Sequence, residues 1–546
     1  MSDPKAPTRH PKPSGLIRSS LVFSGFTLIS RIAGFARDLA VSYSMGASAT
    51  FAADAFNAAF AFPNLFRRIF AEGAFAAAFV PAYSRSLEKD GEQVADELAS
   101  DAMATLAAAT VVITIVAELS MPWLMALMRP GFGANPEKYR LAVLLTQITM
   151  PYLPCMAIYA NLSGVLNARN RFILSGAAPI LLNVWTLVTV LPTHDPVSAA
   201  KWASVGVVLA GVSQAALLWW GVRKSGAVVT LRWPRLTPQI KALIALAIPG
   251  AIGASGTQIN IFSSGMLVSH VNGAASWLAY CERLYQLPQG LVGVAIGVAL
   301  LPRLSRAVQA QDHGQARATM DDAVVFSMAL TLPAAAALVS IPFFFIDALY
   351  TRGAFTTADA HQTANALLQY GWGVPAFVLA QLFSRAFFAR QDTKTPMRYT
   401  LIAVAVQVGL GITLFRLMGV PGLAASTAGA WWLNVAMMGW ALHRRGLYTP
   451  SPKAVSRLIR ILVASVALGA LLGAASYWRV PIQHFLEPLS FGPLHGKELA
   501  IAAVTLLAAG LYPILLFGSG GLTMAEIKGA LRRRKGAPSE DPADLP

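Results

Sequence analysis

Residues 102–128 read AMATLAAATVVITIVAELSMPWLMALM, a run of 27 residues in which Glu118 is the only acidic or basic side chain. About 20 apolar residues in a helix cross the ~30 Å hydrocarbon core of a bilayer, so this run is long enough to span a membrane. Comparable runs recur along nearly the whole chain, separated by short basic breaks that contain proline or glycine. The pattern predicts an all-α polytopic membrane protein without a large soluble domain.

The composition agrees with this prediction. Of the 546 residues, 55% are hydrophobic and 13% are charged, whereas charged residues make up about 25% of soluble domains. The net charge of +17 does not indicate nucleic-acid binding, because the Lys and Arg residues stand at the ends of apolar runs and not in one basic domain. Cys155 and Cys281 both lie within apolar runs, which argues against a disulfide framework or a zinc site. The first apolar stretch, from Leu21, continues past Arg31 as a full span, so we expect no cleavable signal peptide.

Fourteen apolar runs are long enough to be spans. They are residues 19–46, 51–84, 102–128, 140–167, 172–192, 202–222, 240–271, 274–301, 322–349, 362–388, 398–418, 421–442, 458–478 and 498–518. We therefore predict fourteen transmembrane helices.

Basic residues concentrate in alternate loops between these runs. They are Arg85 and Lys89; Arg169 and Arg171; Arg223, Lys224, Arg232 and Arg235; Arg303, Arg306 and Arg317; Arg390, Lys394 and Arg398; and Arg444, Arg445, Lys453 and Arg457. The positive-inside rule places these loops and both termini in the cytoplasm. The acidic, proline-rich residues after Gly536 are typical of a disordered tail.

A shift of about 221 residues superimposes several loop motifs. Residues 81–85 (PAYSR) align with 302–306 (PRLSR), 168–170 (ARN) with 389–391 (ARQ), and the Trp and basic residues at 219–224 with those at 440–445. One offset shared by three sites predicts a duplicated six-helix unit. We predict an N-terminal tail at 1–18, an N-lobe at 19–228, a C-lobe at 229–447, two extra helices at 448–520 and a C-terminal tail at 521–546. Parallel repeats of this kind place substrate between the lobes.

Ionisable residues occur at predicted membrane depth in three helices. They are Arg31, Arg37 and Asp38 in the first; Asp54, Arg67, Arg68 and Glu72 in the second; and Glu282 and Arg283 in the eighth. Such residues usually face a hydrated cavity or one another, since a charge at the bilayer centre costs about 2.5–3.5 kcal/mol. The helical spacing puts Arg31 and Asp38 on one face and allows Arg68 and Glu72 to pair directly.

Two interpretations of these charges remain open. The residues could form structural ion pairs, or Arg37 and Arg67 could snorkel to headgroups near helix ends. Alternatively they form one polar site, and the planar guanidinium of Arg favours bidentate recognition of a pyrophosphate. In that site the acids either hold the arginines ready or take part in a coupling step.

Glycines follow a proline in two adjacent spans. The first set is Pro249, Gly250, Gly253 and Gly256, and the second is Pro288, Gly290, Gly293 and Gly297. Small residues at this spacing are typical of close helix packing, but proline and glycine are also where helices bend. The functional interpretation is a hinge at Pro249, Gly250, Gly253, Gly256 and Pro288.

The sequence contains no Walker A motif, HExxH motif, G-x-S-x-G elbow or dinucleotide fingerprint. We therefore expect no catalytic residues, no bound metal and no cofactor. Direct use of ATP is also not expected. Membrane potential, worth about 2.3 kcal/mol per charge per 100 mV, or an ion gradient is the expected energy source.

Three stretches carry a family resemblance: SRIAGFARD at 30–38, ADAF at 53–56 and PNLFRRIFAEGAF at 63–75. They resemble the MurJ (MviN) family, the lipid II flippases of peptidoglycan synthesis, in the multidrug/oligosaccharidyl-lipid/polysaccharide exporter superfamily. The similarity extends over essentially the whole chain. It implies two six-helix lobes around a cationic cavity, with helices 13 and 14 forming a groove for the polyprenyl tail.

The resemblance also implies roles for the charged residues. Arg37, Arg68 and Arg283 would bind the pyrophosphate. The residues expected in supporting or gating roles are Arg31, Asp38, Asp54, Arg67, Glu72, Glu282 and Gln286. Some members carry an acid one turn after the helix 8 arginine, where this chain has Gln286. This substitution removes the carboxylate that an ion pair there would need.

The predicted function is to flip lipid II, a polyprenyl-pyrophosphate-linked precursor, from the cytoplasmic to the periplasmic leaflet by alternating access. Expected partners are lipid II, membrane lipids and cell-wall synthesis proteins. One alternative is an exporter of another polyprenyl-linked glycan or of drugs. A drug exporter would favour acids and aromatics over paired arginines in its cavity. A second is a membrane-embedded glycan transferase, which would need catalytic carboxylates or His near a hydrated loop.

Overall fold

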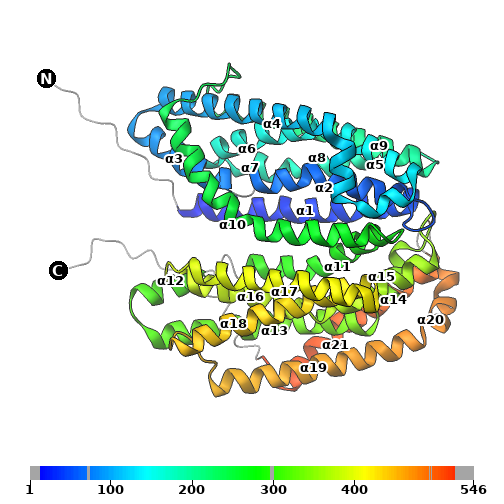
Figure 1. The fold of residues 1–546 in the computed structure, drawn as a ribbon. Coiled ribbons are helices and arrows are strands. Elements are labelled where there is room, and N and C mark those ends of the chain that lie inside the picture. Colours follow the sequence, from blue (N-terminus) through cyan, green and yellow to red (C-terminus); the bar gives the residue numbers. More distant parts are fainter. Residues whose placement is uncertain (1–12, 71–73, 296–300, 491, 493–494, 523–546) are drawn as a thin grey trace, which may run out of the picture. The chain divides into compact units, whose positions relative to one another are not determined.

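The computed structural model describes residues 13–70, 74–295, 301–490, 492 and 495–522, and every regular element in these ranges is a helix (Figure 1). In the first half the helices are α1 (Pro13–Met45), α2 (Ala52–Phe70), α3 (Ala74–Lys89), α4 (Glu92–Met128), the 3₁₀ turn η1 (Pro130–Ala134), α5 (Pro136–Thr149), α6 (Tyr152–Ala168), α7 (Phe172–Ala177), α8 (Pro179–Val190) and α9 (Pro196–Lys224).

In the second half they are α10 (Pro238–Val268), α11 (Ala274–Ala295), α12 (Leu301–Gln309), α13 (His313–Ser340), α14 (Pro342–Tyr350), α15 (Thr357–Gly371), α16 (Val374–Phe388), α17 (Lys394–Met418), α18 (Val420–Arg444), α19 (Pro452–Tyr477), α20 (Arg479–Leu486), the 3₁₀ turn η3 (Glu487–Leu489) and α21 (Gly496–Gly518).

Polar N-caps followed by proline fix where several of these helices begin. Asn135, Asp195, Thr237 and Ser451 each accept a hydrogen bond from a backbone N–H in the first turn of the helix that follows. Proline stands at the next position in all four helices, where its missing N–H costs nothing and its φ already suits a helix. These starts are therefore determined locally.

Four predicted spans contain a break in the helix, although residues 136–168 and 172–190 each still form one candidate span. The runs 140–167, 172–192, 322–349 and 362–388 are each divided into two helices. Pro151, Pro179, Pro342 and Pro375 stand at or just after the four breaks, where proline removes a backbone hydrogen-bond donor. The predicted span 51–84 corresponds to α2 and α3, and residues 71–73 between them lie outside the described part.

Eight described helices or helix pairs are long and apolar enough to cross a membrane. They are residues 92–128, 136–168, 172–190, 196–224, 313–340, 394–418, 452–477 and 496–518. The pair α15 and α16, bent by 40°, would make a ninth. Each coincides with a predicted span, so the multi-pass helical architecture is confirmed. The other five predicted spans fall on α1, α2 with α3, α10, α11 and α18.

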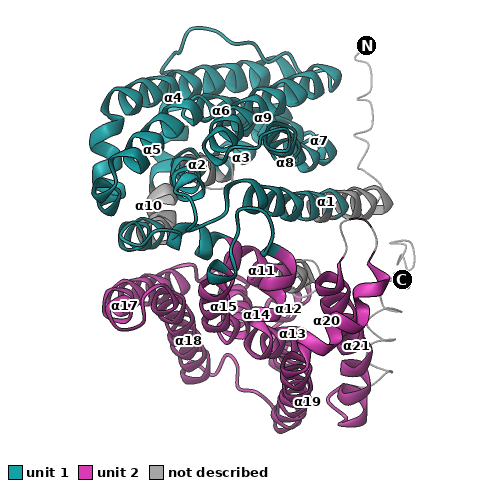
Figure 2. Cartoon of the chain, turned by 90° about the vertical axis from the view of Figure 1, so that its right-hand side faces the viewer, with its two compact units in different colours: residues 1–279, 350–359 teal, residues 280–349, 360–546 magenta. Residues whose placement is uncertain are grey.

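The helices form two compact units, coloured separately in Figure 2. Unit 1 comprises residues 1–279 and 350–359. Within it α4, α6 and α9 pack together, α8 lies between α1 and α9, and α2 packs on α5. Small residues such as Ala199, Ala203 and Val207 on α9 are fully buried and let the helices approach closely.

Unit 2 comprises residues 280–349 and 360–546. Its centre is formed by α13, α16 and α18, with α17 against α18 and α19 against α13. α21 packs on α19 and α20. The buried core contains Met320, Met328, Leu382, Phe387 and Met438. The predicted lobe boundary at residue 228 remains a prediction.

The 221-residue offset reappears in local geometry. Asn170 and Gln391 are 221 apart, and both have a left-handed φ, 59° and 60°. In one turn the N–H groups of residues 170 and 171 donate to the carbonyls of 167 and 166, and in the other those of 391 and 392 donate to 388 and 387. This is the repeated C-terminal turn of a helix. The guanidinium of Arg223 also lies over the Trp219 ring, as Arg444 lies over Trp440.

Candidate functional site

Arg37 on α1 is half-buried and paired with its sequence neighbour. Its Nε and Nη2 both donate to Oδ1 of Asp38, at 3.0 and 2.7 Å, and both side chains are 14% exposed. The guanidinium also lies 6.0 Å from the centre of the Phe60 ring. Arg31 and Asp38 were predicted to share one face of this helix. The structure in addition pairs Asp38 with its sequence neighbour, Arg37. The charge of Arg37 is compensated where it lies.

Asp54, in the first turn of α2, is fully buried and its carboxylate accepts four hydrogen bonds. Nζ of Lys138 donates to Oδ2 at 2.7 Å, and the backbone N–H of Gly273 donates to the same oxygen at 2.7 Å. The N–H and hydroxyl of Ser276 donate to Oδ1 at 3.1 and 2.8 Å. Asp54 thus connects the N-terminal end of α2 to α5 and to the start of α11, all within unit 1. This arrangement is compatible with the gating role implied by the resemblance.

Lys138 was not predicted from the sequence. It is 4% exposed, donates also to Asn272 at 3.1 Å, and lies 4.4 Å from the centre of the Phe132 ring. Asp54 is 84 residues away, so no helical spacing pointed to the pair. The one available signal was its position. Lys138 lies in the predicted loop between spans 102–128 and 140–167, which is not one of the alternate loops where basic residues concentrate.

A second buried carboxylate, Asp359, was also missed. The backbone N–H and hydroxyl of Ser48 and Nε1 of Trp277 donate to its Oδ1, while the N–H and hydroxyl of Thr356 donate to Oδ2. All these groups belong to unit 1. A carboxylate that accepts this many hydrogen bonds is stabilised in its charged form without a cation. Asp359 and the Asp54–Lys138 pair both tie residues 48–54 to residues 272–277.

The other predicted charges on the second span cannot be placed. Arg67 and Arg68 belong to the last turn of α2, but their side chains lie outside the described residues, as does Glu72 entirely. On α11, Glu282 is exposed, while Arg283 and Gln286 are half-buried. Arg283 belongs to unit 2 and Arg37 to unit 1. The convergence of Arg37, Arg68 and Arg283 on one cavity therefore remains a prediction.

The predicted hinge residues lie in two helices. α10 runs without interruption from Pro238 to Val268, and the side chains at 249–259, with Pro249, Gly250, Gly253 and Gly256, lie outside the described residues. Pro288 is inside α11. Bending at these positions stays a prediction.

Nearer its end, α10 has a glycine with a clear packing reason. A Cβ on Gly265 would come within 1.5 Å of Nη1 of Arg129, so any larger residue there would displace this guanidinium. Arg129 is 7% exposed and lies just after α4. Burial lowers the pKa of Arg129 to about 10, although the charge of Asp54 acts in the opposite direction. The C-terminal end of α10 favours a cation at this position.

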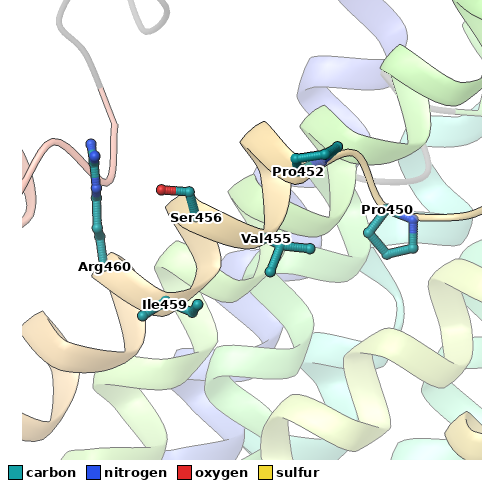
Figure 3. A pocket seen from close by; sticks show the side chains of 6 residues that line it. All are labelled: Pro450, Pro452, Val455, Ser456, Ile459 and Arg460. Atoms are coloured by element: carbon teal, nitrogen blue, oxygen red, sulfur yellow. The ribbon is translucent and has the colours of Figure 1, made fainter.

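A shallow cavity of about 500 Å³ lies on unit 2, and Figure 3 shows its lining. The lining side chains are Pro450, Pro452, Val455, Ser456, Ile459 and Arg460, from the start of α19 and the residue two positions before it. None of the predicted site residues contributes to it, so this hollow is separate from the candidate site.

Comparison with known proteins decides the family. The family model for the lipid II flippase MurJ matches residues 41–490. A probable lipid II flippase MurJ of Rhizobium tropici is 39% identical over 533 residues, which is 96% of this chain and 98% of the relative. The chain belongs to the MurJ family. The MurJ of Burkholderia cenocepacia is 33% identical over 84% of this chain and 89% of its own length.

Solved structures agree in fold. A MurJ structure in an inward closed conformation matches with a TM-score of 0.73 and 24% identity, covering 91% of this chain and 98% of that one. An inward-facing multidrug transporter of the MATE family matches with a TM-score of 0.64 and 15% identity, covering 78% of this chain and 98% of that chain. The fold is therefore shared with a solved MurJ structure and with a transporter of the MATE family. The resemblance identified in helices 1 and 2 is confirmed.

Proposed function

We propose that this chain flips lipid II from the cytoplasmic to the periplasmic leaflet of a bacterial inner membrane, and that it is a transporter and not an enzyme. The observation that carries the proposal is the MurJ family match over residues 41–490, together with relatives named as lipid II flippases along nearly the whole chain. The three arginines predicted to bind the substrate suit such a cargo, because a guanidinium binds phosphate oxygens well.

Arg37, Arg68 and Arg283 are the proposed ligands of the pyrophosphate. In the structure the Nε and Nη2 groups of Arg37 point at one carboxylate oxygen of Asp38. A phosphate can accept hydrogen bonds from the same two donors. When substrate binds, a phosphate would replace the Asp38 carboxylate at this guanidinium. Arg37 would then have an anionic partner both with and without substrate. Asp38 would keep the cation ordered between transport cycles.

The proposed topology has fourteen spans with both termini in the cytoplasm and two six-helix lobes. The alternation of basic loops supports the orientation. Transport would proceed by alternating access, with bending at Pro249, Gly250, Gly253, Gly256 and Pro288. Net flux needs an energy source besides binding. The proposed source is the membrane potential or an ion gradient.

The decisive experiment is flipping of lipid II by the purified chain in proteoliposomes, read as the fraction of a labelled lipid II that becomes accessible in the opposite leaflet. The variants are Arg37→Ala and Arg37→Lys, with Arg140→Gln as a control that removes an exposed cation of unit 1. We expect loss of flipping and of lipid II binding for Arg37→Ala, partial rescue by Lys because the bidentate fork is lost, and full activity for the control.

Two results would contradict the proposal. Turnover of lipid II into a new product would indicate a transferase, and movement of drugs without movement of lipid II would indicate an exporter of another kind. Low abundance of Arg37→Ala with unchanged affinity in the surviving protein would instead make Arg37 a structural residue, leaving the flippase function standing and removing the ligand assignment.

A further inference from the structure

The connection between α9 and α10 exposes an unusual amount of apolar surface for a loop. Residues 227–236, here called the 227–236 loop, include four large apolar side chains that are strongly exposed: Val228 at 70%, Leu231 at 59%, Trp233 at 87% and Leu236 at 62%. They stand outside the helices that cross the membrane. Contiguous exposed apolar groups outside a span mark a surface that is covered by something else.

This loop is held in place along the N-terminal part of α4. The N–H of Val228 donates to Oδ2 of Asp96 at 2.7 Å, and that of Thr230 donates to the hydroxyl of Ser100 at 3.0 Å. Arg232 forms an ion pair with Asp101 at 2.9 Å. Ala227 and Val229 are buried against unit 1 while Val228 faces outward, as the alternation of an extended segment requires. The exposed groups are thus presented by an ordered segment.

The equivalent connection in unit 2 shows that the fold does not need this exposure. Between α18 and α19 the chain uses only residues 445–451, whereas residues 225–237 separate α9 from α10. The shorter connection is pinned in the same way, because the hydroxyl of Tyr448 and the N–H of Ser451 donate to Asp321 on α13. Tyr448 is 5% exposed, and residues 445–451 present no large exposed apolar side chain. The additional residues in unit 1 therefore serve something outside the turn.

The basic residues in and around the loop indicate the chemistry of the surface that covers it. Residues 223–241 contain five basic side chains and no acidic one: Arg223, Lys224, Arg232, Arg235 and Lys241. Arg223, Lys224, Arg235 and Lys241 are exposed, and the loop lies beside α4 residues 96–101, where the predicted hydrocarbon region of that helix has not yet begun. Tryptophan is enriched at this depth of a bilayer, and each Lys or Arg near an anionic surface adds about 1 kcal/mol of attraction.

We propose that the 227–236 loop is a membrane-surface anchor that inserts Trp233 and its apolar neighbours among anionic phospholipid headgroups of the adjacent leaflet. The inserted side chains gain apolar contact, while Arg235 and the cations at the ends of α9 and α10 meet lipid phosphates. This inference rests on the membrane-spanning fold alone and is independent of the cargo that the chain carries.

The test measures the depth of the loop in a bilayer. The full chain, with Cys155 and Cys281 replaced by Ala, receives a single cysteine at Thr230 or at Thr449, which are exposed positions on the two equivalent connections. A nitroxide is attached, and its collision with oxygen and with a water-soluble nickel chelate is measured in nanodiscs of phosphatidylcholine with and without one third phosphatidylglycerol. We expect the label at 230 to be protected from nickel in the anionic nanodiscs, and the label at 449 to remain accessible.

Two further arms identify the cause. In anionic nanodiscs Arg235→Gln should reduce the inserted population of the 230 label by about fivefold, the equivalent of one surface cation, and Trp233→Ala should abolish its protection. Equal protection of the 230 label with and without phosphatidylglycerol would overturn the recognition of anionic lipid. Full nickel accessibility at 230 in both nanodiscs would overturn the anchor altogether and leave a protein partner as the occupant of the apolar surface.

Discussion

One position of the 221-residue repeat carries opposite charges in its two copies. Lys138 lies in the first turn of α5 and Asp359 in the first turn of α15, and the residues three positions earlier, Asn135 and Thr356, both cap their helices. Lys138 is paired with the buried carboxylate of Asp54, whereas Asp359 is held by neutral donors from Ser48, Trp277 and Thr356. A duplicated backbone therefore fixes where a polar group is buried but leaves open how its charge is satisfied. A cation needs an acid brought from elsewhere, while a carboxylate can be satisfied by N–H and O–H groups.

The largest effect is expected at Lys138. Lys138→Met would leave the buried Asp54 carboxylate without its cation, which typically costs about 3–5 kcal/mol of unfolding free energy. We expect a large loss of folded protein in the membrane and a lower thermal midpoint in detergent. The exposed Arg140→Met, two residues further along α5, is the matched control and should leave both unchanged.

The double variant Asp54→Asn with Lys138→Met sharpens this prediction. It removes both charges, so most of the lost stability should return. If the double variant were as unstable as Lys138→Met alone, the unpaired charge would not be the cause of the loss.

A smaller effect is expected at Asp359. Asp359→Asn keeps the shape of the side chain. Its amide has only one acceptor oxygen, whereas the surrounding donors now bind two carboxylate oxygens. One or more donors would remain unsatisfied, at about 1–3 kcal/mol each. The thermal midpoint in detergent should therefore fall by less than for Lys138→Met. A greater loss for Asp359→Asn would mean that the carboxylate held by neutral donors is the more critical of the two.

The smallest effect is expected at the repeated turn. Asp392 follows Gln391 where unit 1 has Arg171 after Asn170. A hydrogen bond from the Thr395 hydroxyl, then the Thr395 N–H and Arg445, lower the pKa of Asp392 to about 2. A depressed pKa contributes stability above the ordinary Asp value near 3.9, and this contribution is lost as the pH falls toward 2.

Since the Asp392–Arg445 pair is at the surface, its contribution should not exceed about 1 kcal/mol. Asp392→Asn should flatten the unfolding free energy between pH 4 and pH 2, measured by chemical unfolding, whereas Arg171→Gln should not change the slope. An unchanged slope in Asp392→Asn would show that other carboxylates dominate acid unfolding.

The helices were predictable because hydropathy alone reports them. The run 102–128 lies within α4 and the run 498–518 within α21, because a chain in lipid must satisfy its backbone hydrogen bonds within the helix. The breaks at Pro151, Pro179, Pro342 and Pro375 were missed because the runs stay apolar across them. These prolines alone did not predict the breaks, because proline also occurs inside other helices of this chain, including α4 at Pro122.

The candidate site was predictable only where its residues are close in sequence. Arg37 and Asp38 are neighbours, and the structure pairs them. Lys138 could not be assigned to Asp54, because the partners meet only after two helices have packed. Asp359 lies just before the apolar run 362–388, and no Lys or Arg stands near enough in sequence to suggest a pair. Applying the 221-residue offset to Asn135 would have pointed to its helix start, but not to the donors of Ser48 and Trp277.

Residues 350–359 make the chain pass between the two units more than once. They belong to unit 1, although the chain on both sides of them belongs to unit 2, so the covalent chain passes between the units at 279–280, 349–350 and 359–360. The segment is fastened to the end of α1, where the N–H of Ala354 donates to the carbonyl of Tyr43, and Gly46 and Gly353 adopt left-handed φ values of 67° and 58°. The crossings at 279–280 and 359–360 lie inside α11 and α15, so at each of them one continuous helix belongs to both units.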